Sequence, residues 1–181
     1  MKFTHTTFAI LFTFLGCLCM AQPSVTLKPD FKNSTYNTNI SEEEVNEINA
    51  QWEKDNAEIQ AYALANNIKD IHWLNSGLFY SIEKQGSGTV PTINSAVKVK
   101  YTLTTLGGAA VWSTDKTGGT EVRALKDFVY GVAEGLQLLK PGGKIMLLIP
   151  SGLAYGKQGW GKKIPANTNI IYNIELLEVY N

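Results

Sequence analysis

Cysteine and histidine are scarce in this sequence, which restricts the chemistry that it can support. Among 181 residues there are two cysteines and two histidines. Cys17, Cys19 and His5 lie near the amino terminus, and His72 stands alone. If the amino-terminal segment is removed on export, the mature protein has no thiol. That excludes a disulfide, a cysteine metal site and a cysteine nucleophile.

An excess of charge of either sign is also lacking. Sixteen basic residues balance 16 acidic ones, so the formal net charge is zero, and the pI is near 6.7. Such a chain has no broad basic field to hold a phosphate backbone, so we expect no nucleic-acid partner. The same balance gives no support for binding to a membrane surface by charge.

No hydrophobic run is long enough to cross a bilayer, which takes about twenty apolar residues. The longest, at residues 8–18, follows Lys2 and precedes Cys-Met-Ala at 19–21. This layout predicts a signal peptide over residues 1–21 and an exported protein, periplasmic or secreted, that begins at Gln22. Residues 22–40 are polar and contain several Pro and Asn residues, which predicts a flexible leader.

Two other interpretations of the amino terminus remain open. Residues 14–17 read Phe-Leu-Gly-Cys, a partial match to a bacterial lipoprotein cleavage box, in which Cys17 would become a lipidated first residue. The aromatic at position 14 and Leu15 fit that box poorly. An outer-membrane lipoprotein anchored at Cys17 is thus the minor alternative, beside a buried first helix.

A helix is predicted over residues 41–66, within a helical amino-terminal extension spanning 41–75. Ser41 with Glu44 forms a capping-box pattern, and acidic residues suit the positive end of a helix. Apolar residues then recur on one face. They are Val45, Ile48, Trp52, Ile59 and Tyr62. This stripe packs either against the following domain of the same chain or against a second copy in a homodimer.

Alternating apolar and polar residues predict most strands in the rest of the chain, and a strongly apolar run predicts the strand at 144–150. The expected strands lie at residues 78–82, 97–104, 122–125, 144–150 and 170–180, and a short apolar helix lies at 131–139. Several such strands around one helix indicate an α+β fold, an antiparallel sheet with the helix on its buried face.

Four motifs in the carboxyl-terminal half carry a specific resemblance. Residues 131–144 read Gly-Val-Ala-Glu-Gly-Leu-Gln-Leu-Leu-Lys-Pro-Gly-Gly-Lys, and residues 149–156 read Ile-Pro-Ser-Gly-Leu-Ala-Tyr-Gly. Ile-Pro follows at 164–165 and Ile-Glu-Leu-Leu-Glu at 174–178. In this order and spacing they resemble FKBP-type peptidyl-prolyl cis–trans isomerases. Residues 76–80 and 86–88 resemble the lead-in of exported bacterial members with a helical amino-terminal extension.

The resemblance implies a fold and a site. Residues 76–181 should form an antiparallel half-barrel of five or six strands wrapped over one short helix, with an apolar pocket between them. By the family pattern, the Tyr155 hydroxyl and the Val129 backbone N–H are the expected catalytic donors. The expected substrate-binding residues are Tyr101, Trp112, Phe128, Val132, Ile164, Tyr172 and, in the flap loop of residues 157–163, Trp160.

Three positions depart from the family pattern. Val132 replaces the tryptophan that usually forms the pocket floor, so we expect a deeper or differently filled pocket. Ser113 stands where an aspartate usually follows an aromatic, here Trp112, and the carboxylate is missing unless Asp115 reaches that place. Residues 122–124 read Val-Arg-Ala, where the family has a strand rich in phenylalanine.

The family's reaction needs neither metal nor cofactor, because rotation about an X-Pro peptide bond makes and cuts no bond. The resemblance therefore implies an isomerase acting on proline-containing polypeptides during the folding of exported proteins. The departures at Val132 and Ser113 keep an alternative open, a non-catalytic chaperone or peptide-binding module with a degenerate pocket.

Overall fold

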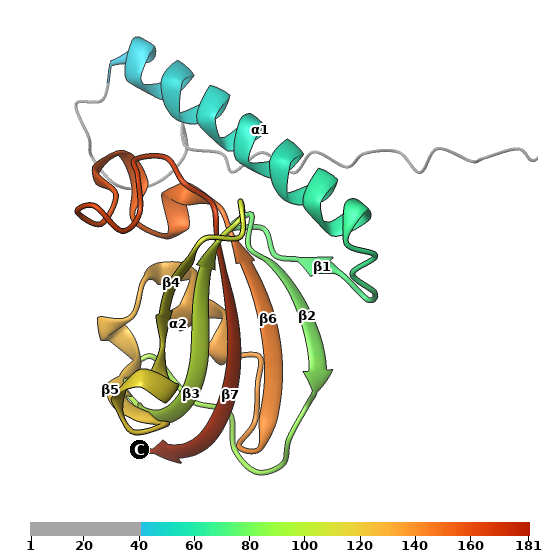
Figure 1. The fold of residues 1–181 in the computed structure, drawn as a ribbon, viewed down its shortest axis with the longest axis vertical. Coiled ribbons are helices and arrows are strands. Elements are labelled where there is room, and N and C mark those ends of the chain that lie inside the picture. The colour runs from blue at the N-terminus through green and yellow to red at the C-terminus, as the bar shows by residue number, and fades with distance from the viewer. Residues whose placement is uncertain (1–40) are drawn as a thin grey trace, which may run out of the picture.

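A computed structural model describes residues 41–181 of the chain (Figure 1). The predicted signal peptide at 1–21, the leader at 22–40 and the lipid attachment at Cys17 lie outside the described residues. Within residues 41–181, no helix is both long and apolar enough to cross a membrane.

Helix α1, Glu42–Ala65, confirms the predicted amino-terminal helix and its cap. The backbone N–H of Glu44 donates to the Ser41 hydroxyl at 3.2 Å, and the Glu44 carboxylate accepts from the Ser41 backbone N–H at 2.9 Å. This reciprocal pair satisfies two of the amide groups that a helix leaves free at its start. Figure 1 shows α1 lying across one end of the sheet.

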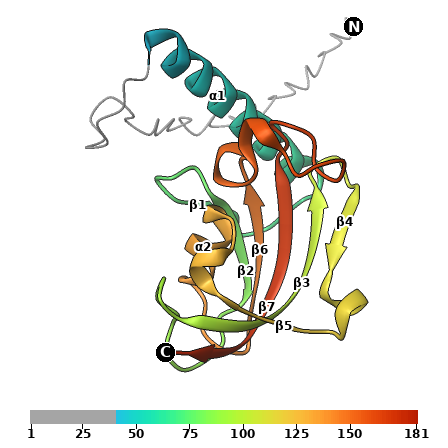
Figure 2. The same ribbon diagram turned by 90° about the vertical axis from the view of Figure 1, so that its left-hand side faces the viewer.

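The remaining chain forms a seven-stranded antiparallel sheet in the order β1-β2-β6-β7-β3-β4, with β5 paired to β3 (Figure 2). The strands are β1 (His72–Trp73), β2 (Phe79–Lys84), β3 (Ala96–Thr105), β4 (Ala110–Ser113), β5 (Glu121–Ala124), β6 (Gly143–Ile149) and β7 (Ile170–Tyr180). Short 3-10 helices are η1 (Thr114–Thr117), η2 (Leu125–Asp127), η3 (Ser151–Leu153) and η4 (Gly156–Gln158). The expected α+β class is confirmed. Six of the seven strands, β2 to β7, lie within residues 76–181, as expected for the half-barrel, and β1 adds a seventh strand at the edge of the sheet.

Helix α2, Tyr130–Leu136, packs on the concave face of the sheet. Gly135 permits the close approach, because a Cβ built there would lie 2.5 Å from a methyl group of Leu147. The expected helix extended to residue 139. Instead, residues 137–139 form tighter turns, with the Leu139 N–H bonded to the Leu136 oxygen, and Pro141 prevents a longer helix. Leu139 is still fully buried.

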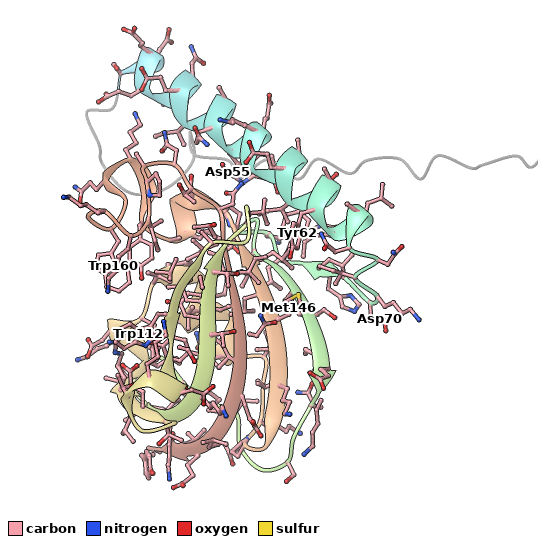
Figure 3. All side chains as sticks on the ribbon, viewed as in Figure 1. Asp55, Tyr62, Asp70, Trp112, Met146 and Trp160 are labelled. Atoms are coloured by element: carbon pink, nitrogen blue, oxygen red, sulfur yellow. The ribbon has the colours of Figure 1, made fainter. Side chains whose placement is uncertain are left out.

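Among residues 41–181, the opposite, convex face is covered at one end, by α1 (Figure 1). Ile59 of α1 packs there with Phe79 of β2 and Leu148 of β6, and Tyr62 and Met146 lie at the edge of this cluster (Figure 3). The carboxyl-terminal part of the apolar stripe on α1 therefore packs against the sheet of its own chain. Towards the amino terminus of α1, Val45 and Ile48 are only half-buried.

Candidate functional site

A pocket of about 580 Å³ opens at the concave side of the sheet, between β3, β4, β5, β7 and the loop after β6. Its lining residues are Tyr101, Leu103, Trp112, Thr117, Thr120, Glu121, Val122, Arg123, Tyr155, Trp160, Lys163 and Tyr172. Figure 3 labels Trp112 and Trp160 on the same side of the molecule. The pocket therefore combines strand residues with a loop that is far away in sequence.

Two tyrosines on neighbouring strands form the inner wall. In the β3–β7 pairing Tyr101 lies opposite Ile174 and Tyr172 lies opposite Leu103, so both rings project from the concave face. Their centroids are 5.3 Å apart, and the Phe128 ring meets Tyr101 edge-on at 6.4 Å. Aromatic rings at such distances attract one another beyond simple area burial.

Both wall tyrosines stay protonated at neutral pH. Burial raises the pKa of Tyr101, and its hydrogen bond to Glu121 raises it further. Burial likewise raises the pKa of Tyr172, with a smaller contribution from the neighbouring Tyr155. Desolvation disfavours the charged phenolate. The pocket thus presents neutral hydroxyl groups, which can donate and accept hydrogen bonds.

A carboxylate contacts the pocket from an unexpected element. The Tyr101 hydroxyl donates to Glu121 of β5 at 2.9 Å. Arg123, two residues along the same strand, pairs with the Glu121 carboxylate through Nε at 2.8 Å and lies 4.9 Å above the Phe128 ring. Sequence reasoning missed Glu121, although residues two apart on a strand share a face and their opposite charges were a usable indication.

Asp115, the residue considered for the missing carboxylate, does not fill that place. It pairs with Lys100 at 3.0 Å, and both side chains are about half exposed. Lys100 alternates with Tyr101 along β3 and therefore projects from the other face of the sheet. Asp115 therefore does not supply the missing carboxylate, and the carboxylate that meets Tyr101 is that of Glu121.

The mouth of the pocket is formed by stacked aromatic rings. Tyr155 and Trp160 lie parallel, with centroids 5.5 Å apart and planes 7° apart. The Lys163 ammonium lies 4.6 Å from the Trp160 ring and 5.2 Å from the Trp112 ring. Such cation–π contacts join the flap loop to β4 across the opening.

The predicted site residues divide into three groups by position. Those that line the pocket are Tyr101, Trp112, Tyr155, Trp160 and Tyr172. Phe128 supports the wall from behind Tyr101, and Val129 is the N-cap of α2 and half-buried. Val132 and Ile164 have no exposed surface and pack in the core, so in this conformation they present no surface to a bound molecule.

Comparison with known proteins agrees with this geometry. Residues 88–177 match the family model for FKBP-type peptidyl-prolyl cis-trans isomerases. A probable FKBP-type peptidyl-prolyl cis-trans isomerase FkpA of Neisseria meningitidis is 37% identical over 121 residues, which are 66% of this chain and 44% of that protein. The outer membrane protein MIP of Legionella longbeachae is 34% identical, over 74% of this chain and 58% of that protein.

The fold is also that of a solved relative. The crystal structure of FkpA from Escherichia coli has a TM-score of 0.63 and 29% identity, covering 79% of this chain and 75% of that chain. The chain spans only about half the length of the curated relatives that it matches. The four motifs, the half-barrel over α2 and the match over residues 88–177 agree, and the chain belongs to the FKBP-type peptidyl-prolyl cis–trans isomerase family.

Proposed function

We propose that this protein is a peptidyl-prolyl cis–trans isomerase that accelerates rotation about X-Pro bonds in other polypeptides. One observation supports this most strongly. Tyr101, Tyr155 and Tyr172 converge with Trp112 and Trp160 on a single pocket, which lies within the region matched by the family. No acid–base pair or nucleophile is required for such a reaction, because no covalent bond to the substrate is made or cut.

The energetic problem is the loss of amide resonance. Rotation about the peptide C–N bond meets a barrier of about 18–20 kcal/mol. A twisted amide is less polar than a planar one, so transfer from water to a place among the aromatic rings penalises the planar ground state more than the transition state. The proline ring would pack between the Tyr172 wall and Trp112.

Hydrogen-bond donors then hold the substrate while the bond turns. We assign the Tyr155 hydroxyl and the Val129 backbone N–H to the carbonyl groups next to proline. The Trp160 ring stacked on Tyr155 restricts the orientation of the Tyr155 ring. Glu121 orients the Tyr101 hydroxyl and, being paired with Arg123, adds no uncompensated charge to the pocket. Pre-oriented dipoles of this kind need no reorganisation during the reaction.

The proposed substrates are exported polypeptides that contain exposed X-Pro bonds. The segment 1–21 supports export, and one relative is named an outer membrane protein. We further propose that residues 41–75 are an extension and residues 76–181 the isomerase domain. Mass spectrometry of the protein from its native cell envelope tests the amino terminus. A chain beginning at an acylated Cys17 would replace the proposed start at Gln22.

A protease-free isomerisation assay on a proline peptide tests the activity. We expect the full chain to accelerate the exchange and Tyr155→Phe, which keeps the ring stack and removes the hydroxyl, to lower kcat/KM by about tenfold, the value of one lost donor of roughly 1.4 kcal/mol. Tyr180→Phe, an exposed tyrosine at the end of β7, is the matched control. A folded parent without activity would favour the non-catalytic chaperone or peptide-binding module.

A homodimer through residues 41–66 remains a separate proposal. Its support is the half-buried pair Val45 and Ile48 on the part of α1 that precedes the sheet contact. Light scattering of the full chain should then give twice the chain mass, and Val45→Glu with Ile48→Glu should give the single-chain mass. A single-chain mass for the parent would end this proposal.

A further inference from the structure

Three nearly fully buried polar residues connect α1 to the isomerase domain. Asp55 of α1 is 1% exposed, Ser151 at the start of η3 is 1% exposed, and Asn169, just before β7, is 2% exposed. Figure 3 labels Asp55 on the side of α1 that faces the domain. These three residues, called here the Asp55 contact, lie apart from the pocket lining and from the predicted site residues.

Every member of the Asp55 contact is hydrogen-bonded. One Asp55 carboxylate oxygen accepts from the Ser151 hydroxyl at 2.6 Å and from the Ser151 backbone N–H at 2.9 Å. The other oxygen accepts from the Gln51 amide at 2.7 Å. The Asn169 side chain accepts from the Ser151 N–H at 3.0 Å and donates to Glu58 of α1 at 2.9 Å. A carboxylate that is buried without such partners would be strongly disfavoured.

The contact lies at the base of the loop that holds Tyr155. Ser151 lies just after the end of β6. Its carbonyl accepts a hydrogen bond at 3.0 Å from the N–H of Ala154, the residue that precedes Tyr155. Beyond Tyr155, the Gly156 carbonyl accepts from the Asn167 N–H at 2.8 Å, which ties the flap loop to the segment preceding Asn169. Fixing Ser151 and Asn169 therefore fixes both ends of the segment that carries Tyr155 and Trp160.

Directional bonds are suited to this task. The apolar cluster of Ile59, Phe79 and Leu148 attracts α1 to the sheet but does not determine its exact position along the loop. The two short hydrogen bonds that one Asp55 carboxylate oxygen accepts from the backbone N–H and the hydroxyl of Ser151 do determine it, since charge-assisted bonds are short and directional.

We propose that Asp55 is a positioning residue of the isomerase, through which the amino-terminal helix sets the placement of Tyr155 and the flap loop. The inference rests on the proposed function for its catalytic consequence, but its structural half stands without it. Asp55 acts through Ser151 and touches no substrate. The amino-terminal helix therefore helps to place residues of the pocket, although it lies outside the isomerase domain.

The test compares three variants of the full chain. Asp55→Ala removes both bonds to Ser151. Asp55→Asn keeps a side-chain oxygen that can accept both hydrogen bonds from Ser151. The Gln51 amide would then flip so that its oxygen accepts from the new Asn amide. Ile59→Ala is the matched control, because it weakens the attachment of the same helix without touching Ser151. The readouts are kcat/KM well below the melting temperature and the NMR signal of the Trp160 indole, assigned with Trp160→Phe.

We expect Asp55→Ala to lower kcat/KM by between about tenfold and a hundredfold. It should also shift or broaden the Trp160 indole signal, because the chemical shift of that signal depends on the position of the stacked Tyr155 ring. Asp55→Asn should restore both, and Ile59→Ala should change neither. If Asp55→Ala does not fold, Ser151→Ala, which removes the hydroxyl bond alone, should shift the same signal and lower kcat/KM to a smaller degree.

The outcomes separate the two proposals. An unchanged Trp160 signal in a folded Asp55→Ala or Ser151→Ala variant overturns the positioning role, and so does an equal effect of Ile59→Ala. An inactive parent overturns the proposed function instead, and the Trp160 signal still decides whether the Asp55 contact places the loop.

Discussion

The two faces of the sheet are stabilised in different ways. On the concave face, α2 and the strands enclose a large apolar cluster that runs along β3, β6 and β7 and reaches the pocket wall at Tyr101 and Tyr172. On the convex face, α1 covers one end of the sheet over a smaller buried cluster that contains Ile59, Phe79 and Leu148. Beside them lies the hydrogen-bonded Asp55 contact.

The difference separates stability from placement. Apolar burial contributes roughly in proportion to area and has no preferred direction, so the concave face contributes most of the folding free energy. A small apolar cluster with buried hydrogen bonds contributes less, but it holds α1 in one position relative to the Tyr155 loop. The pocket depends on both, its wall on the concave core and its mouth on the loop.

Adjacent leucines on β6 give the largest expected effect. Leu147 projects to the concave face and Leu148 to the convex face, and both are fully buried. We expect Leu147→Ala to lower the free energy of unfolding by about 4 kcal/mol and Leu148→Ala by about 2 kcal/mol, because α1 can close part of the cavity. Denaturant unfolding measures both. Equal losses would mean that the convex face is as rigidly packed as the concave one.

The buried wall tyrosine gives a pH dependence. Burial raises the pKa of Tyr172 in the folded state above the value of about 10 in an unfolded chain. The folded state therefore keeps the proton longer, and stability is complete below pH 10 and falls above it, by up to about 1.4 kcal/mol per pH unit. Unfolding between pH 8 and 11 should show a shallower fall for Tyr172→Phe. Parallel curves for parent and variant would contradict the burial of this hydroxyl.

The carboxylate on β5 gives a smaller, kinetic effect. Glu121→Ala removes the bond that orients the Tyr101 hydroxyl, and we expect kcat/KM to fall about fivefold, the equivalent of roughly 1 kcal/mol. Glu121→Gln keeps an acceptor and should stay near the parent. Asp115→Ala is the matched control, because Asp115 pairs with Lys100 outside the pocket. A lower kcat/KM in Asp115→Ala together with an unchanged kcat/KM in Glu121→Ala would mean that Asp115, and not Glu121, is the carboxylate that supports the pocket.

The exposed ion pair between α1 and the loop gives the smallest effect. Lys157 and Glu47 lie 2.7 Å apart, with more than half of each side chain exposed. Ion pairs in water are weak and screened by salt, so Lys157→Met should cause no measurable loss of stability in 0.15 M salt. A loss as large as that of Leu148→Ala would show that surface charge, and not the buried contacts, holds α1.

Local patterns predicted most of the fold. The capping box at Ser41 located the start of α1, and alternation located β2, β3 and β7 because each has residues on two unlike faces. A strongly apolar run located β6, and a strand was also expected at β5. Strand β1 has two residues and β4 has four, which is too few for periodicity to emerge. Helix α2 ended earlier than expected because its last turn tightens ahead of Pro141.

The sequence predicted those pocket residues that lie in a motif or on an alternating strand, and it missed the residue whose place depends on strand pairing. Tyr155 stands in the Leu-Ala-Tyr-Gly motif, and the inward positions of Tyr101 and Tyr172 follow from alternation. Glu121 reaches Tyr101 only because β5 pairs with β3 in one register, Val99 opposite Glu121. Val132 carries the family's floor position but lies in the core, and the family pattern alone does not show this.

The amino-acid sequence alone predicted the fold class, the helix start at Ser41 and the residues at the centre of the pocket, because periodicity, caps and motifs are properties of neighbouring residues. The tertiary structure alone decided which carboxylate meets Tyr101 and which buried bonds hold the Tyr155 loop. Asp55 and Ser151 lie 96 positions apart. Whether two such polar groups are buried together depends on how distant elements pack, and no local pattern encodes that distance.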